Sequence, residues 1–299
     1  MSYNMNTTRK KGCHTMFEAG LVLEGGAERG VFTAGALDYL MERGIEFSYV
    51  CGASAGACNG VDFVSKQIGR SKAAFIPKDP SYRMAKLSAI PSQHALIDMD
   101  MLFDAFPNDL IPFDYDTYFA SPVRCEMVVT NAVSGEAEYR DDRTDHKRFM
   151  DICRASSSIP VFARMVDLDG TPYVDGGVGD SIPLVHSMKL GYRKNFVILT
   201  QKDGYRKKPA GRALEALYRS CFRKYPNLVR ALLNRHLVYN RELDLLKKWE
   251  EEGRVFVLRP KEGVVGRLES DPKILETFYQ HGYDLMKERE SDLLAYLER

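Results

Sequence analysis

The chain has 299 residues, of which 44% are hydrophobic and 28% charged, and its net charge is +1. This composition is globular, is long enough for one large core or two modest domains, and provides no whole-molecule charge to steer an anionic partner. No apolar run approaches the roughly 20 residues of a membrane span, and the polar residues 1–14 lack the apolar region of a signal peptide. The six cysteines are scattered without a Cys-x-x-Cys pair. We therefore expect a soluble, cytoplasmic protein with free thiols and no structural zinc site.

The first part of the chain alternates between expected strands and helices. Residues 19–23 form a short apolar run that predicts a buried strand, and the glycine turn at 24–26 ends it. From Gly30 the apolar residues recur at helical spacing, and Gly44 is placed to cap that helix. A second strand at 49–51 leads into a helix of small residues from about Ala55. Strand followed by helix, twice in succession, predicts an α/β fold with a parallel sheet.

Residues 70–122 differ from their surroundings because they carry six prolines and many aromatic residues. We expect short helices and loops that form a cap near the functional site, although an irregular, fixed surface insert would have the same composition. Further strands are expected at 124–131, 195–200 and 255–258, and Asp169-Gly170 predicts a hairpin turn. The expected organisation is an N-terminal tail (1–16), a core (17–201) with the 70–122 insert, and a mostly helical C-terminal region (202–299) packed on the core.

Ser54 stands in the pattern Gly52-Ala53-Ser54-Ala55-Gly56, after an expected strand and before an expected helix. A sharp strand-to-helix turn exposes a serine hydroxyl, and the two glycines let neighbouring backbone pass without a Cβ clash. This context indicates a nucleophilic serine. Such a serine also needs a base and hydrogen-bond donors for an oxyanion.

The donors are expected in the turn Gly25-Gly26-Ala27-Glu28-Arg29-Gly30. Its backbone N–H groups, around Gly26 and Ala27, would be unpaired at a helix N-terminus and would form an oxyanion hole. A simple tight turn is the alternative, and a nucleotide phosphate loop is disfavoured because neither of its glycine patterns is present. Arg29 opposes the helix dipole, so it would either pair with an acid or meet an anionic ligand.

Asp175 is the best candidate for the base. It ends an expected strand and precedes Gly176 and Gly177, a position where the catalytic groups of α/β folds gather. An aspartate that merely begins a turn would show the same pattern. None of the six histidines lies in a glycine-rich turn or at the end of a clear strand.

Taken together, these motifs resemble the patatin-like phospholipases, which are bacterial lipid acyl hydrolases. The resemblance rests on the order of the motifs at 25–30, 52–56 and 175–177, and on the segment 155–160 that ends in a proline before the aspartate. It extends over about residues 21–199. One departure is Ala27, where the family usually has a third glycine, and an alanine there is costly if its φ is positive.

The resemblance implies a three-layer α/β/α fold with a mostly parallel central sheet, a helical C-terminal extension, and a Ser–Asp dyad without histidine. Ser54 would attack the ester carbonyl, Asp175 would accept its proton, and the N–H groups of Gly25, Gly26 and Ala27 would hold the oxyanion. The other motif positions would support them: Arg29, Gly30, Gly52, Gly56, Gly176 and Gly177. The implied substrate is a lipid or phospholipid acyl ester, and no metal or organic cofactor is implied.

Residues 202–235 carry ten Lys or Arg and two acids. The apolar residues at 214, 217, 221 and 228 form a stripe, arginines lie opposite it at 212, 219, 223 and 230, and Pro226 is expected to divide the segment into two helices. The segment is either a docking surface for anionic phospholipid headgroups at the inner membrane face or a solvated face balanced by acids elsewhere. Nucleic acid is disfavoured because no recognition motif accompanies the charge.

Three functions remain open on the sequence, and the oligomeric state has no signal in it. The leading hypothesis is a serine acyl hydrolase of lipid esters. The second is a histidine-dependent hydrolase of small soluble esters. The third is a catalytically silent lipid-binding or interaction protein on the same fold.

Overall fold

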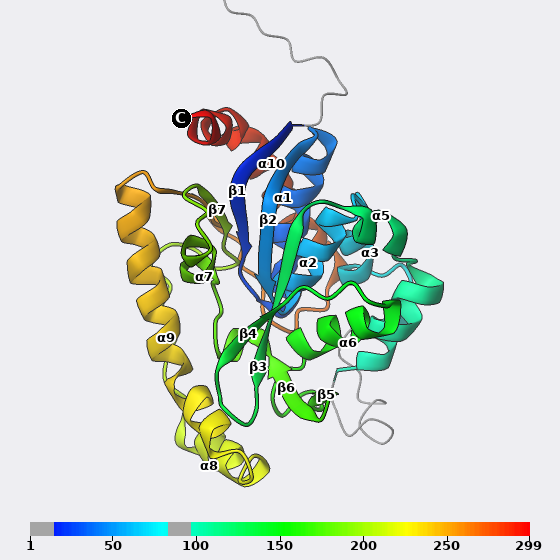
Figure 1. Ribbon diagram of the computed structural model, residues 1–299, viewed down its shortest axis with the longest axis vertical. Helices are drawn as coiled ribbons and strands as arrows, with labels where there is room; N and C mark the ends of the chain where they lie inside the picture. The colour runs from blue at the N-terminus through cyan, green and yellow to red at the C-terminus, as the bar shows by residue number, and fades with distance from the viewer. Residues whose placement is uncertain (1–14, 83–96) are drawn as a thin grey trace, which may run out of the picture.

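A computed structural model describes residues 15–82 and 97–299 (Figure 1). Residues 1–14 of the predicted N-terminal tail, with His14, and His94 and part of the 70–122 insert lie outside the described residues. The last two residues of the predicted tail, Thr15 and Met16, belong to the first strand. No helix within the described ranges combines the length and the apolarity that crossing a membrane would require.

A single mixed sheet forms the centre of the molecule. Its strands are β1 (Thr15–Leu23), β2 (Ile45–Ala53), β3 (Arg124–Asn131), β4 (Ala137–Arg140), β5 (Val166–Leu168), β6 (Thr171–Asp175), β7 (Asn195–Ile198) and β8 (Val255–Leu258). They follow the order β5-β6-β3-β2-β1-β7-β8, and β4 pairs with β3 off this path. The run from β3 to β8 is parallel, whereas the pairs that β3 makes with β4 and β6, and the β5–β6 pair, are antiparallel. The predicted parallel sheet is thus confirmed at its centre and has an antiparallel edge.

The helices follow the strands in the order that the sequence predicted. The α-helices are α1 (Gly30–Glu42), α2 (Ala55–Val64), α3 (Arg70–Phe75), α5 (Tyr115–Ala120), α6 (His146–Ser156), α7 (Leu184–Lys189), α8 (Arg212–Cys221), α9 (Pro226–Glu251) and α10 (Pro272–Glu298). Residues 15–82 and 97–299 also contain a π-helix, η3 (Met101–Leu110), and three short 3-10 turns: η1 (Ala27–Arg29), η2 (Pro80–Tyr82) and η4 (Gly176–Val178). Pro226 begins α9 and α8 ends before it, so the predicted division into two helices is confirmed.

Helices cover both faces of the sheet. Leu21 and Leu23 of β1 join the large apolar cluster formed with α1, α2, α6 and α10, whereas Val22 between them joins a second cluster formed with α7 and α9. Figure 1 shows α7 and α9 on one side of β1 and β2, with α1 and α2 on the other. Because β1 is buried on both faces, its inner half is continuously apolar rather than alternating. The three-layer α/β/α arrangement is confirmed.

The hairpin predicted at Asp169-Gly170 joins β5 to β6. Both residues have positive φ, 57° and 79°, as a two-residue turn between right-twisted strands requires. The hairpin brings Asp175, the last residue of β6, beside Val129 of β3.

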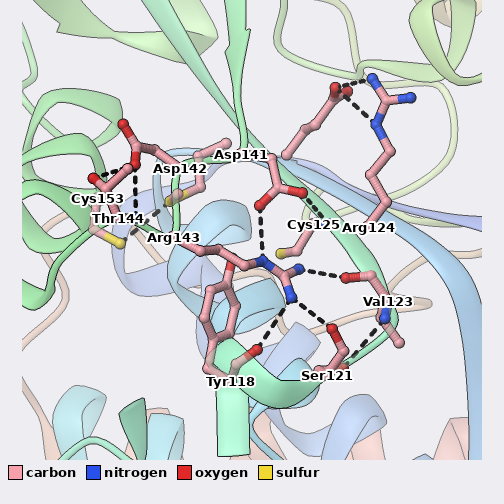
Figure 2. Close-up of polar contacts among 12 residues, drawn as sticks. Tyr118, Ser121, Val123, Arg124, Cys125, Asp141, Asp142, Arg143, Thr144 and Cys153 are labelled. Atoms are coloured by element: carbon pink, nitrogen blue, oxygen red, sulfur yellow. Dashed lines mark hydrogen bonds and ion pairs between the residues drawn. The ribbon is translucent and has the colours of Figure 1, made fainter. Parts of the chain in front are cut away.

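Arg143, in the loop after β4, fixes the point at which the insert rejoins the sheet (Figure 2). Its guanidinium donates to the carbonyls of Tyr118 (3.2 Å), Ser121 (2.6 Å) and Val123 (2.5 Å), and its Nε pairs with Asp141 at 3.1 Å. These carbonyls lie at and beyond the C-terminus of α5, where a helix leaves acceptors unpaired. The Arg143 guanidinium therefore donates to backbone carbonyls at the end of α5 and in the segment that connects α5 to β3.

Candidate active site

Ser54 occupies the turn between β2 and α2. Its backbone has φ 56° and ψ −126°, and its side chain is almost buried. A positive φ is strained for a residue with a Cβ, and such a strained strand-to-helix turn is the elbow that carries nucleophilic serines. The amide of Ser54 donates to Ser156 Oγ at 3.0 Å, and that hydroxyl donates in turn to the carbonyl of Val128 at 2.6 Å. The elbow is therefore tied to β3 through Ser156.

Gly52 and Gly56 allow the backbone segments around the elbow to approach one another. A Cβ on Gly52 would overlap the carbonyl of Gly56, and a Cβ on Gly56 would overlap the carbonyl of Leu23 in β1. Both overlaps involve backbone atoms, which cannot move aside as a flexible side chain can. The structure thus gives a steric reason for each glycine of the Gly-x-Ser-x-Gly pattern.

The glycine turn after β1 lies against the serine. A Cβ on Gly25 would come within 2.7 Å of the Ala53 carbonyl and 3.1 Å of Ser54 Cβ. Within the described part of the chain, the N–H groups of Gly25, Gly26 and Ala27 find no backbone acceptor. Ala27 has φ 51°, so this position does adopt the conformation that favours glycine. Unpaired donors beside a strained serine are the arrangement that an oxyanion hole requires.

Asp175 ends β6 and is 4% exposed. Its Oδ1 accepts from the Gly177 amide at 2.8 Å, and its own amide donates to the Ser158 carbonyl at 2.9 Å. Asp175 and Ser54 line the same pocket, but no hydrogen bond links their side chains in the described structure. Segment 156–158 therefore contacts both candidate catalytic residues: Ser156 accepts from the Ser54 amide, and Ser158 accepts from the Asp175 amide. The sequence motifs indicated this segment but did not indicate that it positions Ser54 and Asp175.

The supporting motif positions lie around this pair. Gly176 begins η4 and leaves no room for a Cβ beside the Val128 carbonyl, and the carbonyl of Gly30 accepts from Asn59 Nδ2 at 2.9 Å. Arg29 is buried in η1, and its Nε donates to the Gly26 carbonyl at 3.3 Å. Burial and the nearby charge of Arg267 lower the pKa of Arg29. The sequence predicted that Arg29 either pairs with an acid or meets an anionic ligand. In the described structure no acid lies within ion-pair distance of Arg29, which favours the anionic ligand.

Comparisons with known proteins agree with this geometry. A family model described as patatin-like phospholipase matches residues 21–186. The chain belongs to the patatin-like phospholipase family. A second model, described as a domain of unknown function (DUF6363), matches residues 225–298, which span α9, β8 and α10.

Individual relatives extend the family match. The uncharacterized protein YjjU of Escherichia coli (strain K12) is 31% identical over 193 residues, which are 60% of this chain and 51% of that protein. The chain thus spans about half the length of this relative. The crystal structure of VipD from Legionella pneumophila aligns with a TM-score of 0.52 at 14% identity, over 94% of this chain and 67% of that one. This likeness shows the fold.

Two pockets of this patatin-like fold meet at Ser54. One is an apolar cavity of about 860 Å³, lined largely by the insert, including Phe75, Phe103 and Phe106. The other is a polar pocket of about 520 Å³, lined by Asp175 and by four cations: Arg29, Lys207, Arg235 and Arg267. Ala27, Ser54 and Ile159 line both. The nucleophile candidate therefore stands between an apolar and a cationic compartment.

Of the four cations of the second pocket, the sequence motifs indicated Arg29 and missed Lys207, Arg235 and Arg267. Lys207 and Arg235 lie within the basic segment 202–235, which was interpreted only as a surface. The predicted apolar stripe of that segment is not continuous, because Leu228 is buried whereas Leu214 and Leu217 are exposed. The segment therefore divides into pocket-lining residues and an exposed helix, α8.

Histidines do not enter the site in the described structure. None of the four described histidines (His146, His186, His236 and His281) lines either pocket. His186 contacts Glu126 through Nε2 at 2.7 Å and stacks on Tyr139 with ring centroids 3.4 Å apart. Its partners are therefore structural ones within the sheet and α7.

Proposed function

We propose that the chain hydrolyses acyl esters of lipids through a covalent acyl-enzyme on Ser54, with Asp175 as the base. The observation that carries this proposal is the strained elbow at Ser54, packed beside a turn of unpaired N–H groups. Asp175 lies on the wall of the same pocket. Family membership supports the general reaction, and the geometry supports these residues as its agents.

In the proposed reaction, Asp175 accepts the proton of Ser54 Oγ as this oxygen attacks the ester carbonyl. The N–H groups of Gly25, Gly26 and Ala27 stabilise the oxyanion, each by about 3 kcal/mol. The leaving alcohol takes the proton from Asp175, and a water molecule deprotonated by the same carboxylate then releases the fatty acid. The separation of Ser54 and Asp175 has to shorten when substrate binds, as catalytic hydrogen bonds commonly do.

The apolar cavity supports a lipid as the substrate. Its wall is mostly aromatic and aliphatic, and among the described residues that line it Arg70 is the one cation, paired with Asp62 at 2.6 Å. An acyl chain that enters this cavity would place its carboxyl end at Ser54, where the cavity meets the polar pocket. A small soluble ester would leave most of this apolar surface uncovered.

Kinetics of variants test the proposal. Ser54→Ala and Asp175→Asn should each lower hydrolysis of a p-nitrophenyl acyl ester by about a thousandfold or more, because the two groups act as one unit. His186→Gln and His281→Gln serve as controls, with folding checked by circular dichroism. If a histidine variant abolishes activity while Asp175→Asn retains it, the dyad is wrong. If the wild type turns over no ester and Ser54 resists fluorophosphonate labelling, the chain is a catalytically inactive lipid-binding or interaction protein.

We also propose that α8 contacts anionic lipid surfaces. None of its residues is buried, and Leu214 and Leu217 are 39% and 41% exposed. Arg212 and Arg219 lie on the same helix, and α8 lies at one end of the molecule in Figure 1. An exposed helix with an apolar stripe and basic flanks has the chemistry of a peripheral membrane contact.

A further inference from the structure

The polar pocket beside Ser54 is built mostly by parts of the chain outside the patatin-like match. Of its four cations, only Arg29 lies within residues 21–186. Arg235 and Arg267 belong to the region matched by the domain of unknown function, and Lys207 lies between the two matches. The C-terminal region therefore supplies three basic side chains to a pocket whose nucleophile comes from the core.

These cations contact neutral groups rather than acids. Arg235 Nε donates to the Gly177 carbonyl at 2.5 Å, and Lys207 Nζ lies 4.1 Å from the centroid of the Tyr239 ring. In the described structure, neither of them, nor Arg29 or Arg267, has a carboxylate within 4.0 Å. Among the described residues, the four basic side chains around this pocket of about 520 Å³ thus form no ion pair.

The two acids of the pocket are already engaged. Glu24 accepts from the Tyr239 hydroxyl at 2.6 Å and from the Thr200 amide at 2.6 Å, and Asp175 accepts from the Gly177 amide. Neither carboxylate forms an ion pair with a pocket cation in the described structure, although Asp175 opposes the lowering of the pKa of Arg235, and Glu24 that of Arg29 and Lys207. The basic side chains of the pocket outnumber its two acids, and this excess favours an anionic ligand.

Electrostatics show that the cations act on one another. Burial, followed by the charges of Arg235 and Arg267, lowers the pKa of Lys207 to about 6. Burial likewise lowers the pKa of Arg235, with Arg267 adding to the effect. Such crowding of like charges is unfavourable in the empty protein and is relieved when an anion binds.

We propose that this pocket binds the phosphate of a net-anionic lipid headgroup, while the acyl chain of the same substrate occupies the apolar cavity. The proposal rests on the proposed function and specifies its substrate class as acyl esters of glycerophosphate without a compensating cation. The two compartments meet at Ser54 and Ala27, so a phosphate on one side and an acyl chain on the other place the ester at the nucleophile. A choline headgroup is disfavoured because its ammonium would face the same cations.

Short-chain substrates that stay monomeric test the pocket without a membrane surface. The wild type should hydrolyse dihexanoyl phosphatidylglycerol with a kcat/KM about tenfold or more above that for dihexanoyl phosphatidylcholine. Lys207→Met and Arg267→Gln should each reduce this ratio about tenfold. Arg241→Gln, on the exposed face of α9, removes the same charge outside the pocket and should leave the ratio unchanged. Equal rates for both headgroups, or a ratio that no pocket variant changes, would overturn the proposal.

Binding measured without turnover separates this inference from the proposed function. Calorimetry on Ser54→Ala should show that glycerol 3-phosphate binds, and that Lys207→Met or Arg267→Gln, added to it, weakens binding about tenfold. Absence of binding, or binding that both pocket variants leave unchanged, overturns the inference even if esters are hydrolysed. Inorganic phosphate that binds as tightly as glycerol 3-phosphate, with no headgroup preference in the kinetics, would mark a free-phosphate site instead. If binding is as expected and the wild type hydrolyses no ester, the proposed function alone fails.

Discussion

Two residues with a Cβ adopt positive φ in the turns that line the candidate site, Ser54 at 56° and Ala27 at 51°. The strain at Ser54 has a functional reason, because the elbow presents the hydroxyl to both pockets. Nothing in the structure requires a methyl group at Ala27. The alanine at position 27, where the family usually has glycine, therefore costs conformational free energy in this turn.

Ala27→Gly should raise the free energy of unfolding by up to about 1 kcal/mol. The left-handed conformation costs an alanine about 1–2 kcal/mol, and the greater backbone freedom of glycine offsets part of this gain. Chemical denaturation measures the change. Gly253→Ala is the reverse control, since Gly253 has φ 69° with nothing within 4 Å of an added Cβ, and it should destabilise. A loss of stability in Ala27→Gly would contradict the account of this turn.

The site residues that could be predicted from the sequence are those that belong to motifs continuous along the chain. The elbow, the glycine turn and the Asp-Gly-Gly step are each continuous in sequence and lie at ends of strands, so local pattern alone named Ser54, Gly25 and Asp175. The structure brings these three to one pocket. The tie from Ser156 to the Ser54 amide joins residues 102 apart in sequence, and no local signal reports such a contact.

Among the α-helices in the described part of the chain, α8 differs from the others because it buries no residue. Its amphipathic pattern was visible in the sequence, but a pattern does not reveal whether the apolar stripe meets the core or the solvent. Here Leu214 and Leu217 are exposed, whereas Leu228, four residues into the matched domain, is buried. The exposed stripe is the basis of the proposed membrane contact.

Replacing both leucines of α8 tests this contact. Leu214→Ser combined with Leu217→Ser should weaken binding to phosphatidylglycerol vesicles about tenfold, because about 1 kcal/mol or more of apolar contact is lost with the two side chains. Cosedimentation measures the binding. Leu237→Ser on α9 is the matched control, since Leu237 is 59% exposed but lies outside α8. If all three proteins bind equally, α8 is a solvated face.

At the scale of the whole molecule, the chain joins a patatin-like core to a C-terminal region that packs on it and enters its pocket. α10 contributes Phe278 and Tyr279 to the same apolar cluster as Phe32 of α1. α9 covers the opposite face and brings Arg235 beside Gly177. The sequence predicted a mostly helical region here, and spacing within 202–235 predicted two helices divided at Pro226. Their position over the active site depends on tertiary packing, which is why the cations of the pocket could not be assigned from sequence.

The cationic pocket should make stability depend on pH through Lys207. The charges and acids around its amine are Arg29, Arg235, Arg267, Glu24 and Glu242. Its pKa of about 6 in the folded protein lies below the ordinary value of 10.5, so the unfolded chain binds more protons between these values. Lys207 therefore lowers the free energy of unfolding most at low pH. This destabilisation declines as the pH rises toward the pKa of Lys207 in the unfolded chain.

Lys207→Met should accordingly stabilise the unliganded protein by about 1 kcal/mol or more at neutral pH, and the gain should shrink toward zero near pH 10.5. Denaturation of wild type and variant across this range measures the difference between them. Taking the difference removes the opposing trend of Glu28, whose pKa burial raises to about 8. Glu242, whose pKa burial raises to about 9, interacts with Lys207, so its contribution differs between the two proteins. A gain that is constant with pH, or a loss, would contradict this electrostatic account.

The central claim is a covalent acyl-enzyme on Ser54, and trapping that intermediate tests it most directly. Asp175→Asn, mixed with an activated long-chain ester such as a p-nitrophenyl acyl ester and quenched in acid, is digested and analysed by mass spectrometry. Both steps need this carboxylate, but p-nitrophenolate leaves without protonation, so acylation is slowed less than deacylation, in which Asp175 has to activate water. The acyl group should therefore accumulate on the peptide that contains Ser54 and be absent from Ser54→Ala. An acyl group found on another residue, or hydrolysis that continues in Ser54→Ala, would contradict the account.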